Sequence, residues 1–116
     1  MILLPVDYGY AFDVLSIALV KVQKKILNSE NWYEKISKSI SDQIGENLFN
    51  LIMSSKEFEN LHISNLKTFD CVEKARYESN SISAKEVDDC NMERYYCKVN
   101  LQKKFFPETL ILENKS

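Results

Sequence analysis

Several charged and polar residues lie within apolar segments of this 116-residue chain. At such positions they need hydrogen-bond partners or opposite charges beside them. The segment from Gly9 to Lys21 is apolar on nearly every side when drawn as a helix, which is typical of a helix buried all round. It nevertheless carries Asp13, Ser16 and Lys21. A carboxylate, a hydroxyl and an ammonium group are costly to bury without hydrogen bonds or opposite charges. Other parts of the chain are therefore expected to supply those partners.

Two later segments carry suitable partners. At about 100° per residue, Arg94 and Lys98 fall in line with the apolar positions of one helix, and Asn91 lies beside them. Asn65 lies in the middle of the apolar stripe of another helix. We expect one inward-facing polar network, made of Asp13, Ser16, Lys21, Asn65, Asn91, Arg94 and Lys98.

Two roles fit such a network. In the first it only fixes the register of the helices, and the long cationic side chains reach the solvent at their ends. In the second it binds an anion such as a sugar phosphate or a nucleotide. Arg94 then offers a planar fork of donors and Lys98 a point charge. Three cations against one or two acids, Asp13 alone or Asp13 with Glu73, would leave a positive surplus that a bound anion neutralises. A partner protein is the other ligand considered.

An enzyme acting on a phosphorylated substrate is the alternative function, with Asp13 as base or metal ligand. The sequence contains no HExxH, P-loop, GxGxxG or nucleophile-elbow motif, and no cofactor is predicted. His62 is the only histidine. It lies beside an apolar stripe, so a packed histidine is favoured over a catalytic base.

The composition indicates a single all-α domain spanning residues 1–116. Apolar residues make up 45% of the chain and charged residues 28%, and two Gly and two Pro leave little material for loops. A formal net charge of −2 gives no general attraction to nucleic acid or to an anionic membrane, and neither is expected as a partner.

The N-terminal residues and the cysteines bear on location. The start of the chain lacks the basic region of a signal peptide, and its first helix is too short to span a bilayer. A cytoplasmic protein is therefore expected. No two of the three cysteines, Cys71, Cys90 and Cys97, have the spacing of a C-x-x-C pair. This argues against a disulfide scaffold or a zinc site and favours the interpretation that they are small buried hydrophobic residues.

Two helices are predicted in the first half of the chain. The first runs from about Tyr10 to Leu27, with Asp7 as a candidate cap. Ser29 is the candidate N-cap of the second, which Gly45 kinks. Its apolar stripe comprises Trp32, Ile36, Ile40, Ile44, Leu48, Leu51 and Ile52.

Two more helices are predicted in the second half. Ser54 and Glu57 have the spacing of a capping box, so a third helix should begin there and reach about Glu78. Its inward positions are Phe58, Leu61, Phe69, Val72 and Ala75. A second capping box, Ser83 with Glu86, begins a fourth helix that ends at about Phe106, before Pro107.

Four helices of about twenty residues with short connections favour antiparallel neighbours. We therefore predict a four-helix up-and-down bundle, followed by a short tail over residues 109–116. The first helix is more apolar than one small bundle requires, so completion by a homodimer is the alternative. A purely structural homodimer without a ligand is the third functional hypothesis.

Scattered positions over almost the whole chain resemble a known family. The N-terminal matches to its G-E-x-x-D-K-L-S/T-I-L-x-I-K signature are Gly9, Asp13, Leu15, Ser16, Ile17 and Lys21. Asn65, and then Asn91, Arg94 and Lys98, resemble its later Asn and N-D-x-R-x-x-x-K positions. The family is the small bacterial group named domain of unknown function sixty-one sixty-five. The resemblance implies a helical fold and no particular activity, and Tyr10 stands where the family has Glu.

Overall fold

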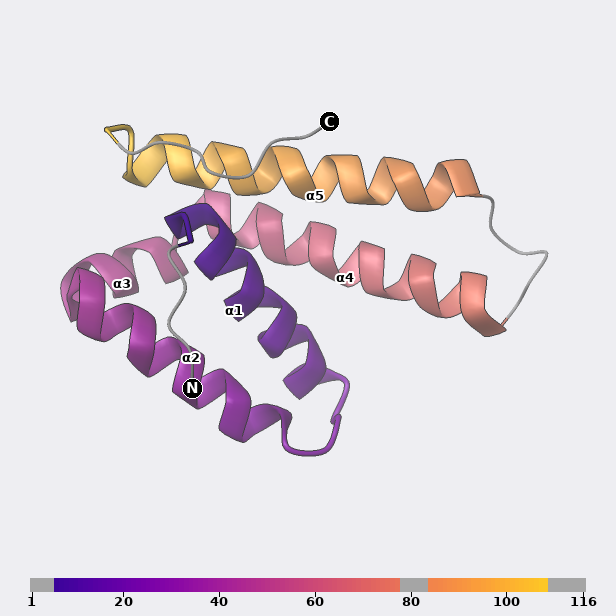
Figure 1. The fold of residues 1–116 in the computed structure, drawn as a ribbon, viewed down its shortest axis with the longest axis horizontal. Helices are drawn as coiled ribbons and strands as arrows, with labels where there is room; N and C mark the ends of the chain where they lie inside the picture. Colours follow the sequence, from indigo (N-terminus) through magenta and orange to yellow (C-terminus); the bar gives the residue numbers. More distant parts are fainter. Residues whose placement is uncertain (1–5, 78–83, 109–116) are drawn as a thin grey trace.

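The computed structural model describes residues 6–77 and 84–108, and this part of the chain contains helices and no strands (Figure 1). The helices are α1 (Tyr8–Gln23), α2 (Ser29–Ile44), α3 (Glu46–Met53), α4 (Lys56–Tyr77) and α5 (Ala84–Phe105). The all-α prediction is confirmed. Ser83, which the predicted capping box needs, and the predicted tail over 109–116 lie outside the described residues.

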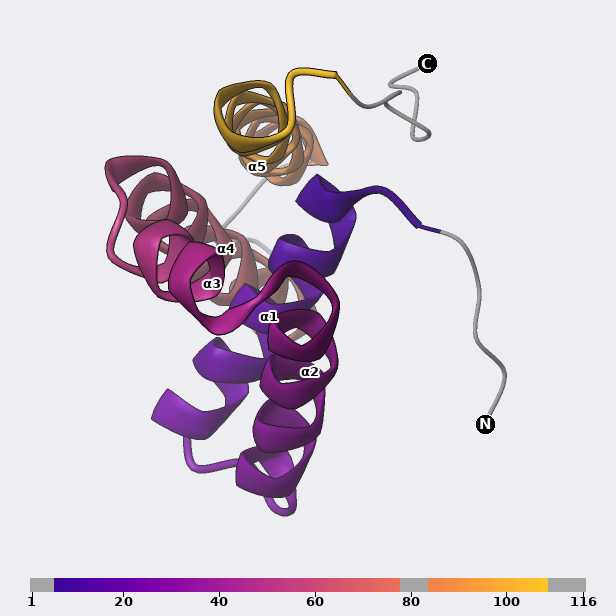
Figure 2. The same cartoon turned by 90° about the vertical axis from the view of Figure 1, so that its left-hand side faces the viewer.

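The helix α1 is the central element of the fold. It packs against α2, α4 and α5. Figures 1 and 2 show α4 and α5 lying side by side as a long pair, with α1 between that pair and α2. The apolar character of α1 on nearly every side therefore reflects its neighbours on several sides within one chain.

The second predicted helix is divided at Gly45 into α2 and α3. Gly45 has a φ of 91°, in the region that glycine adopts without a steric penalty. The short helix α3 then leads the chain back to α4 (Figure 1). The described residues consequently form five helices where the sequence predicted four.

The predicted N-terminal caps can be compared with the structure at the starts of α1 and α4. Asp7 caps α1 as expected, since its Oδ1 accepts a hydrogen bond from the Tyr10 N–H at 2.6 Å. The start of α4 is displaced by one residue from the prediction. The Ser55 hydroxyl, and not that of Ser54, accepts from the Phe58 N–H at 3.1 Å.

The prediction for the junction of α1 and α2 was wrong in detail. The first helix ends at Gln23 and not at Leu27. Lys25 and Asn28 both have positive φ, so the chain turns sharply there. Ser29 is already inside α2, and its hydroxyl donates back to the Ile26 carbonyl instead of capping the helix.

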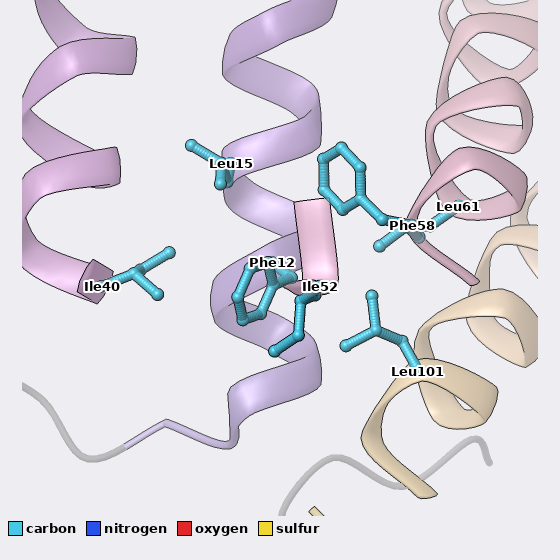
Figure 3. Packing of buried hydrophobic residues seen from close by; sticks show 7 residues of the cluster. All are labelled: Phe12, Leu15, Ile40, Ile52, Phe58, Leu61 and Leu101. Atoms are coloured by element: carbon cyan, nitrogen blue, oxygen red, sulfur yellow. The ribbon is translucent and has the colours of Figure 1, made fainter. Parts of the chain in front are cut away.

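The hydrophobic core gathers residues from all five helices (Figure 3). Its buried members are Phe12, Leu15, Ile40, Ile52, Phe58, Leu61 and Leu101. Four residues predicted to face inward are exposed instead, namely Trp32, Leu51, Val72 and Ala75. Val72 and Ala75 lie in the last turns of α4, and Leu51 is on the solvent side of α3.

Gly9 marks the closest approach of α1 to α5. A Cβ at this position would lie 2.9 Å from the Lys98 carbonyl oxygen and 3.2 Å from the Gln102 side chain. The Gly9 N–H also donates to Gln102 Oε1, so the two helices are joined at this point. The residue is therefore glycine because the neighbouring backbone leaves no room for a side chain.

We predict that Gly9→Ala destabilises the fold by about 1–2 kcal/mol. Forcing α1 away from α5 costs up to about 3 kcal/mol, and the better helix propensity of alanine returns up to about 1 kcal/mol. Urea unfolding followed by circular dichroism measures the difference. The Gly45→Ala variant tests backbone strain without crowding, since a Cβ there meets nothing within 4 Å. An unchanged or higher stability of Gly9→Ala would contradict the close approach.

Candidate functional site

The centre of the polar network is an ion pair between α1 and α5. Arg94 NH2 lies 2.8 Å from Asp13 Oδ2, and Arg94 Nε donates to Asp13 Oδ1 at 3.2 Å. The amide of Asn65 on α4 also donates to Asp13 Oδ1, at 3.0 Å. The Asp13 side chain is only 1% exposed, whereas that of Arg94 is 30% exposed. This paired, three-donor arrangement is what makes a buried carboxylate tolerable.

A second group of contacts continues the network along α1 and α4. The Asn65 amide donates to Ser16 Oγ at 3.0 Å. Ser16 Oγ lies 3.0 Å from His62 Nδ1, and His62 Nε2 lies 2.9 Å from Gln23 Oε1. Because the Gln23 oxygen is an acceptor, the ring hydrogen belongs on Nε2, and Nδ1 accepts from the Ser16 hydroxyl. Hydrogen bonds thus run without a break from Gln23 to Arg94.

Helical spacing explains how three helices can build one row of polar contacts. Asp13 and Ser16 are three residues apart on α1, and His62 and Asn65 are three residues apart on α4. Side chains at this spacing share a helix face. The two faces meet where α1 crosses α4, and Arg94 reaches them from α5.

Five of the seven residues expected in the network are brought together: Asp13, Ser16, Asn65, Asn91 and Arg94. Asn91 joins at the edge, where its Oδ1 accepts from Arg94 NH1 at 3.4 Å. Whether any of them binds a ligand stays a prediction. His62 and Gln23 were missed, although the spacing of His62 from Asn65 repeats that of Asp13 from Ser16.

The two lysines of the predicted network lie elsewhere. The Lys21 ammonium group lies 4.9 Å from the centre of the Trp32 ring, on the α2 side of α1. Lys98 is buried, with its ammonium group 5.8 Å from the Tyr10 ring centre and 5.5 Å from that of Tyr95. The hydrogen bonds at Asp13 join its carboxylate to one guanidinium group, that of Arg94.

His62 is half-buried, and burial lowers its pKa below the usual value of 6.5, while an interaction with the Ser16 backbone raises the pKa to a smaller extent. The folded protein therefore favours the neutral imidazole, which is the form that accepts from the Ser16 hydroxyl. The network is consequently built for a neutral histidine at pH 7.

We predict that stability falls as the pH falls below about 6.5. In that window the unfolded chain binds a proton at His62 more readily than the folded chain, so protonation favours unfolding. Since the ring is half-exposed, the loss should stay below about 1 kcal/mol. Urea unfolding at several pH values between 7.5 and 5.5 measures it. The His62→Gln variant should show a shallower pH dependence, and an equal dependence in both proteins would contradict the assignment to His62.

A pocket of about 190 Å³ lies against the ion pair, between α1 and α4. Its lining residues are Ile17, Val20, Asn65, Thr68, Phe69, Val72 and Arg94. Most of this lining is apolar, and the two network residues Asn65 and Arg94 contribute its polar wall. Lys24 lies over the ring of Phe69, one of the lining residues, and forms an ion pair with Asp70 at 3.0 Å.

A larger hollow of about 500 Å³ lies at the turn between α1 and α2. Its lining residues include Lys25, Asn28, Glu30 and Glu34, all of which are exposed. No residue of the polar network lines it. Because ligand sites are usually enclosed by apolar walls with few polar groups, the smaller pocket is the better candidate.

Two further observations limit the chemistry of the described residues. Residues 6–77 and 84–108 contain no group of three or more His, Cys, Asp or Glu side chains arranged to hold a metal ion. Within the same residues, every helix is too short or too polar to cross a membrane.

Comparisons with protein-family models, with curated proteins and with solved structures found no match for this chain. The chemistry of the site is therefore inferred from its own residues.

Proposed function

We propose that this chain is a small helical binding protein that anchors an apolar side chain of a partner protein in the pocket between α1 and α4. The observation that carries the proposal is the location of an apolar pocket directly against a charge-balanced ion pair, Asp13 with Arg94. The polar network holds α1, α4 and α5 at a fixed spacing and so keeps the pocket open. The binding itself comes from burial of the ligand's apolar surface.

The size of the pocket supports a side chain as its ligand. Small-molecule and cofactor sites usually measure about 300–1,000 Å³. A cavity of about 150 Å³ holds one benzene ring. At about 190 Å³ the pocket matches one large aliphatic or aromatic group. An apolar centre with the polar Lys24–Asp70 pair beside it also resembles the core and rim of protein interfaces.

The charges support a neutral ligand over the phosphorylated one expected from the sequence. Arg94 points two of its nitrogens at Asp13, so the guanidinium charge is already neutralised. A phosphate at Arg94 would also meet the Asp13 carboxylate behind it, and like charges repel. An apolar group with a neutral carbonyl oxygen avoids that repulsion.

Burial of the candidate catalytic groups favours binding over catalysis. Asp13 is 1% exposed and both of its oxygens accept hydrogen bonds. A general base must come within hydrogen-bond reach of the proton it removes, and no substrate reaches Asp13 in this arrangement. Ser16 lies beside His62 but is fully buried, so this serine and histidine do not form an accessible nucleophile pair.

We further propose a cytoplasmic location and a relationship to the family named domain of unknown function sixty-one sixty-five. The free thiols of Cys71, Cys90 and Cys97 fit a reducing compartment. The resembling positions Gly9, Asp13 and Arg94 are those that join α1 to α5. A second copy of the chain is a partner of the proposed type, since a homodimer would supply apolar side chains such as the exposed Leu27.

The experiment that tests the pocket uses N-acetyl-leucinamide as a neutral probe carrying one apolar side chain between two peptide groups. The ¹⁵N-labelled protein is titrated with the probe and followed by two-dimensional NMR. We expect concentration-dependent shifts of the amides of Val20, Thr68, Phe69 and Val72, with saturation in the millimolar range, as for a small ligand of this size.

A matched pair of variants on α4 controls the experiment. Val72 lines the pocket and is 37% exposed, whereas Ile63 lies outside it and is 43% exposed. A tryptophan at either position is tolerated because both side chains face solvent. Val72→Trp should abolish the shifts, and Ile63→Trp should leave them unchanged. Equal binding by both variants, or shifts scattered over the surface, would overturn the proposed site.

A further inference from the structure

Two cysteine side chains meet between α4 and α5, close to Thr68. Cys71 Sγ lies 2.8 Å from Cys90 Sγ. Both thiols are free, and both residues are partly exposed to solvent. They are thus accessible to small oxidants, in contrast to the small buried hydrophobes expected from the sequence.

Neighbouring contacts hold the two helix backbones together at this point. The Thr68 hydroxyl, one turn before Cys71, lies 3.3 Å from the Cys90 carbonyl oxygen. Lys67 forms an ion pair with Glu93 at 3.4 Å between the same two helices. The thiols are consequently held close by groups other than themselves, and little backbone motion is needed to join them.

We propose that Cys71 and Cys90 form a reversible disulfide when the protein meets a peroxide. Cys71 first releases its thiol proton, and the thiolate attacks one peroxide oxygen. The O–O bond breaks, the sulfur becomes a sulfenic acid, and the leaving hydroxide takes up the released proton as one water molecule. Cys90 Sγ then attacks that sulfur, the S–S bond forms and the S–O bond breaks. The Cys90 proton leaves with the hydroxyl group as a second water, so hydrogen peroxide is reduced to two waters while two thiols are oxidised.

The surroundings of the two cysteines determine which of them reacts with the peroxide first. Burial, followed by the hydrogen bond with Cys71, raises the pKa of Cys90 to about 11. Cys90 therefore keeps its proton at neutral pH, until this proton leaves with the hydroxyl group in the second step. The attack on peroxide requires a thiolate, so this first step is assigned to Cys71 and not to Cys90.

The test oxidises reduced, folded protein with hydrogen peroxide, blocks remaining thiols with N-ethylmaleimide and maps the peptides by mass spectrometry. Before alkylation we expect a monomer lighter by two hydrogen atoms. The peptide map should then show Cys71 linked to Cys90, and Cys97 alkylated. Dithiothreitol should restore all three thiols. Closing a loop of this length should raise the midpoint of thermal unfolding by roughly 5–10 °C.

Variants and a denatured control complete the test. Cys97→Ser should form the same link, and oxidation in concentrated urea should give a mixture of pairings because the folded geometry is lost. In Cys90→Ser the reaction should stop at a sulfenic acid on Cys71, which dimedone labels. Links that involve Cys97, links between chains, or alkylation of both Cys71 and Cys90 after oxidation of the folded protein would overturn the proposal.

Discussion

Arg94→Met is expected to lower the free energy of unfolding by about 3 kcal/mol. Removing one partner of a buried ion pair typically costs about 3–5 kcal/mol, because the remaining charge is left without compensation. The lower end applies here, since the Arg94 side chain is 30% exposed and water could partly solvate Asp13 in its absence. Urea unfolding at pH 7 measures the change, which is a large share of the stability of a small domain.

Two companion variants separate the charge from the packing. Arg94→Lys keeps a cation but loses the paired donors to Asp13, so about half of the loss is expected. In the double variant Asp13→Leu with Arg94→Met, apolar groups replace both charges, and stability should recover relative to Arg94→Met alone. If the free energy of unfolding of Arg94→Met lies within about 0.5 kcal/mol of the wild-type value, the buried ion pair is not formed in solution.

Phe12→Ala is expected to cost about 3–5 kcal/mol, the usual range for removing a buried phenylalanine. Phe12 is fully buried among the core residues shown in Figure 3. The centre of its ring lies 6.1 Å from that of Phe49 and 6.2 Å from that of Phe58. The loss combines the transfer of the ring to water with the cavity left between α1, α3 and α4. Thermal and urea unfolding should agree on its size.

Leu51→Ala is the matched control for Phe12→Ala. Leu51 is also a large apolar residue, but its side chain is 58% exposed on α3. Its truncation should change stability by less than about 0.5 kcal/mol. A comparable loss in both variants would mean that the exposed face of α3 is covered in solution, as in a homodimer, and that the core of a single chain is not the main source of stability.

The helical class and the main ion pair could be predicted from the sequence because both depend on periodicity. Asp13 and Arg94 each interrupt an apolar helix face, so each needs an opposite charge, and each is the other's partner. Asn65 was placed with them because it also interrupts an apolar helix face. These inferences require only the face of each helix and not its position in space.

The lysines and the far end of α4 could not be predicted in this way. A lysine side chain has four rotatable bonds, and the periodicity of the sequence does not determine where its ammonium group lies. The Lys21 ammonium group lies against Trp32, and that of Lys98 lies near two tyrosine rings. Val72 continues the apolar stripe of α4 but is 37% exposed at the mouth of the pocket. The pocket itself depends on how far each helix extends past its neighbours.

The most direct test of the central claim compares two probes that share the leucine side chain and differ at the C-terminal group, the neutral N-acetyl-leucinamide and the anionic N-acetyl-leucinate. Each is titrated into the ¹⁵N-labelled protein at pH 7, and the dissociation constants come from the shifts of the Val20 and Phe69 amides. Because Asp13 already neutralises Arg94, we predict that the two constants agree within about threefold, a difference below about 1 kcal/mol. Binding of the carboxylate at least tenfold more tightly than the amide would contradict this account and identify Arg94 as the centre of an anion site.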